Sequence, residues 1–207
     1  ILKTKVGGHQ IVYFDNAATT QRPLPVVNAV LDYTTHENGN PHRGAHLFAI
    51  SASEAYDTSK EVVRDFIHAR SEKEIIYTRN TSESLNLVAR SYGETHLKAG
   101  DHILITIAEH HSNLVTWQRV AQKTGATLDY IYVDKETGHF PEEELKKIDD
   151  PRVKLFAFAE VSNVLGIDFD PKPLIQRAHA HGAIVVLDGA QSTPHKPVDV
   201  QDLDCDF

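Results

Sequence analysis

The chain alternates short apolar runs with stretches of helical pattern, and this alternation constrains its fold more than any other feature. Residues 184–187, Ile-Val-Val-Leu, form an uninterrupted apolar run. Such a run is typical of a strand in a parallel sheet that is covered on both faces. Between the runs, apolar residues recur at helical spacing. The order predicts an α/β fold: a mostly parallel sheet with helices on both faces.

The same patterns place the individual elements. Strands are expected at Glu74–Thr78, His102–Ile107, Thr127–Val133, Lys154–Ala159 and Ala183–Asp188. Helices are expected at Pro25–Thr35, Phe48–His68, Ser82–Leu97, Ser112–Thr124, Pro141–Ile148 and Pro171–His181. No internal repeat and no linker rich in Gly, Ser or Pro interrupts this order. We therefore expect residues 1–12 to form an N-terminal arm and residues 13–207 to belong to one large domain.

Composition narrows the functional classes. The formal net charge is −8, and no basic run is interleaved with aromatic residues, so neither nucleic acid nor a membrane surface is an expected partner. The single cysteine, Cys205, excludes an internal disulfide framework and indicates a reducing compartment. No apolar run approaches the ~20 residues of a membrane span. A cytoplasmic protein is expected.

Both ends of the sequence indicate a fragment. It begins at Ile1 and contains no methionine, and it stops at "DCDF", which has the pattern of a chain entering a strand. We expect part of the large domain and a smaller C-terminal domain to lie beyond Phe207.

Functional side chains follow four of the expected strands. The segments are "RNTSES" after Thr78, "AEHHSN" after Ile107, "EVSNVLG" after Ala159 and "DGAQS" after Leu187. Ligands of open α/β sheets bind beyond the carboxyl ends of the strands, so these segments are expected to form one site. Taken singly, most of them have ordinary explanations: Thr81 or Ser82 as a helix cap, Asn163 as a turn residue.

Together the residues describe a small phosphorylated ring cofactor. Thr81 and Ser82 precede a helix, whose free N–H groups and dipole favour phosphate. Asp188 follows a buried strand, where a carboxylate is costly unless a cation such as a protonated ring nitrogen pairs with it. His110 offers a flat ring, and Gln191 an amide for a ring hydroxyl. Neither GxxxxGK[ST] nor GxGxxG occurs, and the set matches pyridoxal 5′-phosphate.

The motifs also carry a family resemblance. The chain resembles the class V, fold-type I enzymes that use pyridoxal 5′-phosphate, and most closely the cysteine desulfurases of the SufS type. The segments that carry this resemblance are "YFDNAATTQRP", "HRGAH", "EHHSNLVTWQ", "VSNVLG" and "DGAQSTPHKPVDVQDLDCDF". The resemblance implies an enzyme that removes sulfur from L-cysteine, giving L-alanine and an enzyme persulfide for iron–sulfur cluster assembly. It also implies a sulfur-acceptor protein as partner and a homodimer.

Roles for individual residues follow from the same resemblance. Asp188 is implied to pair with the pyridine nitrogen and keep it protonated. His110 is implied to stack on the ring and to move protons. Gln191 and Asn163 are implied to bind on the side of the ring hydroxyl.

Phosphate binding is the role implied for Thr81 and Ser82. The chain has Asn80 and Ser84 where relatives often have Gly, so the individual phosphate contacts are not fixed by the resemblance.

Two parts of the family's machinery are expected beyond Phe207: the lysine that forms the Schiff base and the cysteine that carries the persulfide. Cys205 lies between acids, whose charge raises the pKa of a thiol and weakens it as a nucleophile. Lys196 lies in a loop flanked by proline and is a poor substitute for the lysine. The 207 residues alone are therefore expected to be inactive toward cysteine.

Alternatives remain open at this point. Within the family they are an aminotransferase, a selenocysteine lyase or a kynureninase-like enzyme. Outside it, the residues could belong to a non-catalytic α/β domain whose strand ends merely cap helices. A metal protein is a weaker reading despite thirteen histidines, because His179 and His181 are two residues apart and His110 and His111 lack ligands at zinc spacing.

Overall fold

The computed structural model describes residues 3–207. Residues 1–2 of the expected arm lie outside the described part. The chain forms two compact units, Ile1–Val63 and Arg64–Phe207. The boundary predicted after residue 12 stays a prediction.

The first unit consists of a small hairpin and helices. Strands β1 (Lys5–Val6) and β2 (His9–Gln10) pair antiparallel, and the helices are α1 (Leu24–Asp32), which a π-helical turn extends to Glu37, and α2 (Leu47–Phe66). Helix α1 begins after Pro23, with Pro25 in its first turn, where a missing N–H costs nothing. The helices expected at Pro25–Thr35 and Phe48–His68 are thus present.

The second unit contains a four-stranded parallel sheet with the order β4-β3-β5-β6. Its strands are β3 (His102–Thr106), β4 (Thr127–Ile131), β5 (Val153–Ala159) and β6 (Ile184–Asp188). All three pairings are parallel, and β5 pairs with β6 so that Ala159 lies opposite Asp188. This confirms the predicted α/β class.

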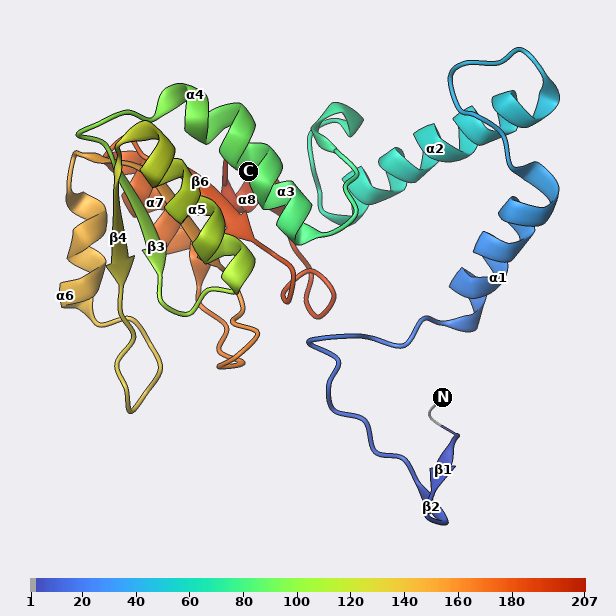
Figure 1. Ribbon diagram of the computed structural model, residues 1–207, viewed down its shortest axis with the longest axis horizontal. Helices are drawn as coiled ribbons and strands as arrows, with labels where there is room; N and C mark the ends of the chain where they lie inside the picture. The colour runs from blue at the N-terminus through green and yellow to red at the C-terminus, as the bar shows by residue number, and fades with distance from the viewer. Residues whose placement is uncertain (1–2) are drawn as a thin grey trace. The chain divides into compact units, whose positions relative to one another are not determined.

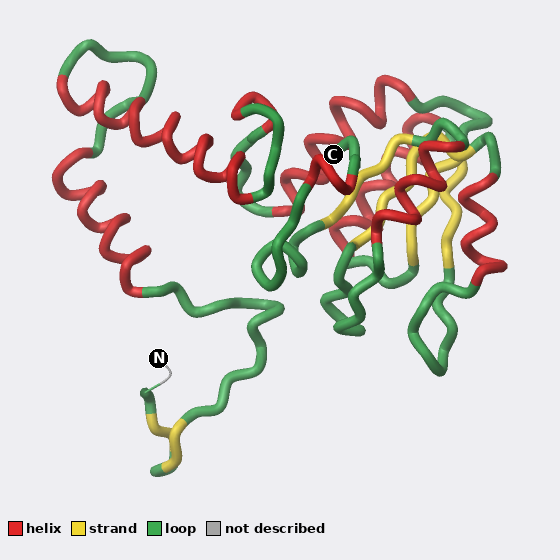
Figure 2. The backbone as a smooth tube through the Cα atoms, turned by 180° about the vertical axis from the view of Figure 1, so that it is seen from behind, coloured by secondary structure: helices red, strands yellow, loops and turns green. Residues whose placement is uncertain are grey.

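Helices cover both faces of this sheet (Figures 1 and 2). They are α3 (Thr81–Val88), continued by a π-helical turn (Ala89–Gly93) and α4 (Glu94–His96); α5 (His111–Thr124); α6 (Glu142–Leu145), followed by a 3-10 turn (Lys146–Asp149); α7 (Pro171–Ala180); and α8 (Val200–Leu203). Each lies within a few residues of its expected position or, for α8, is additional. No helix in the described part of the chain is both long and apolar enough to cross a membrane.

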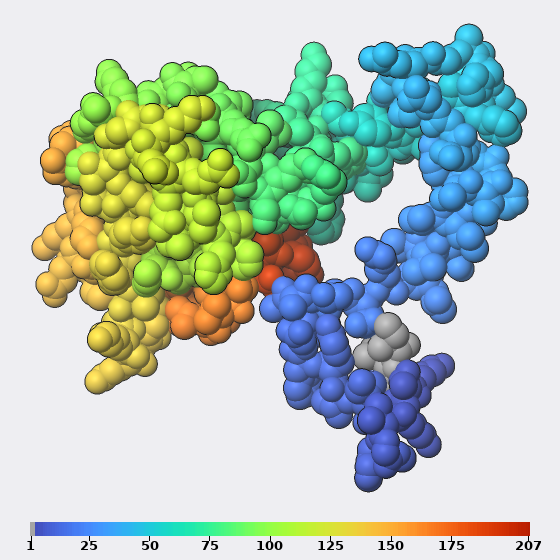
Figure 3. Space-filling view, viewed as in Figure 1, coloured from blue at the N-terminus to red at the C-terminus, as the bar shows by residue number. Residues whose placement is uncertain are grey.

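Alternation along the strands divides the core into two layers. Ile103 and Ile105 point to one face, where Trp117 of α5 and Leu85 of α3 pack against them. Leu104 points to the other face, where it joins Ile175 of α7 and its neighbours. In the space-filling view the green and yellow-green residues of α3 to α5 form much of the visible face of this unit (Figure 3).

The strand predicted at Glu74–Thr78 is wrong. Its first residue ends a 3-10 turn (Glu72–Glu74) and Ile75 is extended, but the segment belongs to neither sheet among the described residues. Its pattern is still partly informative, because Ile75 is buried whereas Ile76 is 67% exposed. A strand requires a hydrogen-bonding neighbour as well as β-forming residues, and here β6 instead exchanges backbone hydrogen bonds with Phe207.

Candidate active site

The carboxyl ends of β3, β5 and β6 meet at one edge of the sheet because the strands are parallel. Thr106 ends β3, Ala159 ends β5 and Asp188 ends β6. The start of α3 lies at the same edge, since Thr81 and Asp188 line one cavity of about 340 Å³. Leu85, Gly189 and Thr193 also line it. Two of the four segments that the sequence singles out, the start of α3 and the turn after β6, thus line one cavity.

Asp188, the last residue of β6, is the acid of this edge that lines the cavity. Only 5% of the residue is exposed, and its Oδ1 accepts a hydrogen bond from the Ala190 N–H at 3.0 Å. Burial raises the pKa of the Asp188 carboxyl, against the opposing effects of the Ala190 hydrogen bond and the charge of His110. A carboxylate with so little solvation is suited to pairing with a cationic group of a ligand.

His110 is the N-cap of α5, and its charge also acts on Asp188. A structural role as helix cap and a role in the site are therefore compatible. Its Nδ1 accepts from the Ser112 N–H at 3.2 Å and lies 2.6 Å from the Ser112 hydroxyl. Because a backbone N–H can only donate, Nδ1 is the acceptor in this contact, so the neutral form of the ring carries its proton on Nε2. That nitrogen belongs to an exposed side chain and can exchange a proton with a ligand.

The first turn of α3 differs from the simplest reading of its sequence. Asn80 is the N-cap, and its Oδ1 accepts from the Glu83 N–H at 2.9 Å. The hydroxyls of Thr81 and Ser82 are therefore not the cap. Thr81 faces the cavity, whereas Ser82 is exposed and is not among the residues that line it. The Glu83 N–H is thus already bonded to Asn80. The N–H groups of Thr81 and Ser82, at the very start of the helix, are the ones that an anion would use there.

Asn163 and Gln191 lie in two loops that one lysine joins. Lys196 Nζ lies 2.7 Å from both Glu160 Oε1 and Asp168 Oδ1, so it ties the loop after β6 to the segment after β5. Asn163 and Gln191 are partly buried, and neither lines the cavity of Asp188 among the residues described. Their roles stay predictions.

The structure adds Glu109, to which the sequence analysis gives no role. Its carboxylate accepts hydrogen bonds from the Thr106 hydroxyl, from Asn113 Nδ2 at 2.6 Å and from the Ala159 N–H at 3.1 Å. Burial raises the pKa of Glu109 to about 7. The sequence carries two signals that could have identified Glu109. Like Asp188, it is an acid close to the end of a buried strand, and the amide of Asn113 follows it four residues later on the next helix.

Cys205 and Lys196 are poor nucleophiles in the structure, as expected. Burial raises the pKa of the Cys205 thiol, and the charges of Asp206, Glu160 and Asp204 add to this effect. For Lys196, burial alone would lower the pKa, but hydrogen bonds and charge from Asp168 and Glu160 outweigh it and raise the pKa. Both groups therefore keep their protons near neutral pH.

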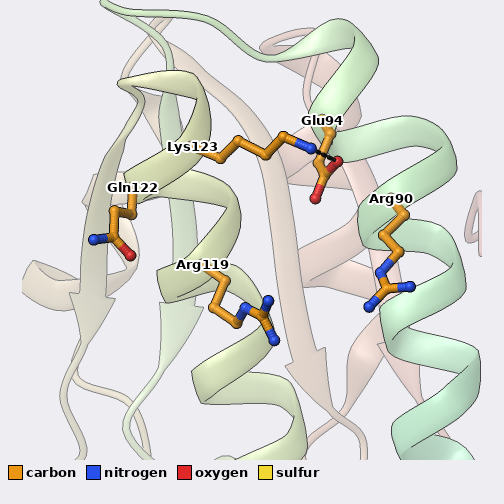
Figure 4. Close-up of a pocket in the computed structure, with 5 residues that line it drawn as sticks. All are labelled: Arg90, Glu94, Arg119, Gln122 and Lys123. Atoms are coloured by element: carbon orange, nitrogen blue, oxygen red, sulfur yellow. Dashed lines mark hydrogen bonds and ion pairs between the residues drawn. The ribbon is translucent and has the colours of Figure 1, made fainter.

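A larger hollow of about 490 Å³ lies apart from the strand ends (Figure 4). It is lined by Arg90, Glu94, Arg119, Gln122 and Lys123, which come from the helices over one face of the sheet. Lys123 pairs with Glu94 across it. It contains none of the residues that the sequence singles out. Within residues 3–207, no group of three or more His, Cys, Asp or Glu side chains is arranged to hold a metal ion.

Known proteins resemble this chain over its whole length. It is 47% identical to a probable cysteine desulfurase of Halalkalibacterium halodurans and 46% identical to a cysteine desulfurase of Synechococcus elongatus. Each alignment covers all of this chain, but 51% and 33% of the respective relative. The chain thus spans about half the length, or less, of the curated relatives it matches.

Solved structures give the same result. The apo cysteine desulfurase of Thermococcus onnurineus NA1 superposes with a TM-score of 0.88 at 42% identity, over 95% of this chain and 48% of that one. The cysteine desulfurase CsdA of Escherichia coli superposes with a TM-score of 0.83 at 38% identity, over 93% of this chain and 48% of that one. The model of the aminotransferase class-V family matches residues 12–207. The chain therefore belongs to the aminotransferase class-V family.

Proposed function

We propose that this chain forms the cofactor-binding part of a cysteine desulfurase that uses pyridoxal 5′-phosphate. The observation that carries the proposal is the buried carboxylate of Asp188, which shares a cavity with the first turn of α3. Relatives and structural neighbours that are named cysteine desulfurases support the choice of L-cysteine over the substrates of other class V enzymes. The products would be L-alanine and a persulfide on the enzyme.

The residues at the sheet edge fit this cofactor. Asp188 is buried and accepts a hydrogen bond from the Ala190 N–H, and a carboxylate in such a place suits pairing with a cationic ring N–H. A side chain on Gly189 would place its Cβ 2.9 Å from Thr193 Oγ1, so a larger residue would crowd the wall of the cavity next to Asp188. The first turn of α3 offers N–H groups and the Thr81 hydroxyl for a phosphate at the other side of the same cavity.

Each residue would have a distinct task. When bound, the cofactor supplies a ring that takes up the electron pair released at the substrate's α-carbon. Asp188 would hold the proton on the ring nitrogen, because a carboxylate in a poorly solvated site stabilises the adjacent positive charge. His110 would exchange a proton through Nε2, the nitrogen that Ser112 leaves free. Ser82, Asn163 and Gln191 are proposed as further cofactor contacts.

The sulfur step needs groups other than the two that the sequence analysis weighs here. Neither Cys205 nor Lys196 has the lowered pKa that a nucleophile requires. We propose that the persulfide forms on a different cysteine and passes to an acceptor protein for iron–sulfur assembly, and that the enzyme is a homodimer in the cytoplasm.

Substitution of Asp188 tests the proposal. The unmodified chain should bind added pyridoxal 5′-phosphate, which is measured by its visible absorbance, and Asp188→Asn should weaken that binding. In the whole protein, Asp188→Ala should lower alanine formation from L-cysteine by about 10²–10³-fold, the usual cost of losing one preorganised charge. Asp202→Asn removes an exposed acid that pairs with Lys172 and serves as the control. Normal turnover in Asp188→Ala would refute the proposal.

A further inference from the structure

A chain of hydrogen bonds leads from a buried tryptophan to the edge of the sheet. Trp117 Nε1 donates to Asn113 Oδ1 at 2.7 Å, and Asn113 Nδ2 donates to Glu109 Oε2 at 2.6 Å. Both Trp117 and Asn113 are fully buried, and Trp117 belongs to the core cluster between α5 and the sheet. The chain ends on Glu109, which directly precedes His110.

The direction of each bond in this chain is fixed. An indole N–H can only donate, so Asn113 must present its oxygen to Trp117 and its amide hydrogens to Glu109. The Thr106 oxygen lies 3.2 Å from the Ala108 N–H and accepts from it, which leaves the hydroxyl hydrogen for Glu109. The Ala159 N–H can only donate. Glu109 thus faces three donors and has no substitute among neutral side chains of its size.

Glu109 also joins three elements that carry the candidate site. Thr106 is the last residue of β3, Asn113 lies in the first turn of α5, and Ala159 is the last residue of β5 and lies opposite Asp188 in the sheet. His110 stands between Glu109 and Asn113. We propose that Glu109 is a positioning residue, which fixes the turn of His110 against the strand ends beside Asp188. This inference rests on the proposed function for the tasks of His110 and Asp188.

Ionisation of Glu109 gives the proposal a measurable signature. Burial raises the pKa of this carboxyl most, and the charge of Asp188, at the end of β6, raises it further. His110 in turn lowers the pKa of Asp188. An acid with a raised pKa binds more protons folded than unfolded between its two pKa values. The free energy of unfolding should therefore fall as pH rises from about 4.3, the ordinary value for Glu, to about 7.

Trp117 reports on this ionisation directly, because it is the only tryptophan of the chain. In the unmodified, cofactor-free protein, the indole ¹H–¹⁵N resonance should titrate with a midpoint of about 7, the pKa of Glu109. Glu109→Gln should abolish that titration. Thr106→Val, which removes one donor to the charged form, should move the midpoint upward and provides a second variant if Glu109→Gln does not fold. A flat titration in the unmodified protein would overturn the coupling of Trp117 to Glu109 through Asn113.

Cofactor affinity then separates positioning from mere stability. Glu109→Gln places an amide opposite the Asn113 amide, and it should weaken binding of added pyridoxal 5′-phosphate at least about tenfold. Glu94→Gln, a control that breaks only the ion pair with Lys123, should leave the affinity unchanged. Unchanged affinity in a folded Glu109→Gln would overturn the positioning role. If the unmodified protein failed to bind the cofactor, the proposed function would fail, and the indole titration would still decide whether Glu109 organises the strand ends.

Discussion

The two units of the chain use apolar side chains in opposite ways. In α1 of the first unit no residue is buried, and Val30 is 63% exposed. In the second unit Ile103, Leu104 and Ile105 are fully buried between the helix layers. The apolar content of α1 is no lower than that of α5, which supplies Trp117 and Val120 to the core. The difference shows that helical periodicity specifies a helix, whereas burial depends on a surface for the helix to cover.

The largest expected effect is in the core of the second unit. Phe156 is fully buried and stacks on Phe158, with ring centroids 4.6 Å apart. Phe156→Ala should lower the free energy of unfolding by about 3–5 kcal/mol, because lost packing and a cavity add together. Urea unfolding followed by Trp117 fluorescence measures the loss, and Phe156→Leu should cost less. A loss below about 1 kcal/mol would mean that the sheet core does not stabilise this unit.

Replacing His110 tests whether the second unit, which contains the core, also contains the residues that take part in the reaction. His110→Ala should slow cysteine turnover in the whole protein by about 10²–10⁴-fold, the usual contribution of a general acid or base. His111→Ala is the adjacent control. His36→Ala, whose ring contacts Thr35 and the Asp32 carbonyl in its own helical turn, is the control in the first unit. Damage from His111→Ala together with a silent His110→Ala would show that the other ring acts.

The smallest effect is expected on α1. Val30→Ala removes an exposed β-branched residue from a helix and should change stability by no more than about 0.5 kcal/mol, with a slight gain from helix propensity. Thermal unfolding monitored by circular dichroism at several protein concentrations measures it. A loss of 2 kcal/mol or more would break the comparison, because it would show that Val30 is covered in solution.

The sequence predicts most of the second unit because the relevant signals are local. Short apolar runs locate β3, β5 and β6, and helical spacing locates α5 and α7. The segment Glu74–Thr78 shows the limit: its residues favour a strand, but pairing depends on a neighbour that no local pattern reveals. The β1–β2 hairpin was also not expected, since two-residue strands have no period to detect.

The sequence also predicts part of the candidate site. Asp188 and Thr81 line one cavity, as expected from the rule that ligands bind at the carboxyl ends of parallel strands, whereas the role of His110 stays a prediction. Three consecutive residues can cap α3, and only the backbone geometry shows that Asn80 does so. Glu109 was not predicted because its contact with the Ala159 N–H joins residues that are distant in sequence. That contact forms only when β5 pairs with β3.

The strand order has a consequence for synthesis on the ribosome. β3 pairs with β4 on one side and with β5 on the other, although β4 precedes β5 in the chain. A nascent chain can therefore form β3 and β4 first, while the other edge of β3 waits for β5. At translation rates of about 5–20 residues per second, roughly fifty residues of delay leave that edge unpaired for about 3–10 s. The sheet then grows in one direction only, through β5 to β6, so a pause in translation between β4 and β5 would prolong the state in which an apolar strand edge is open to other chains.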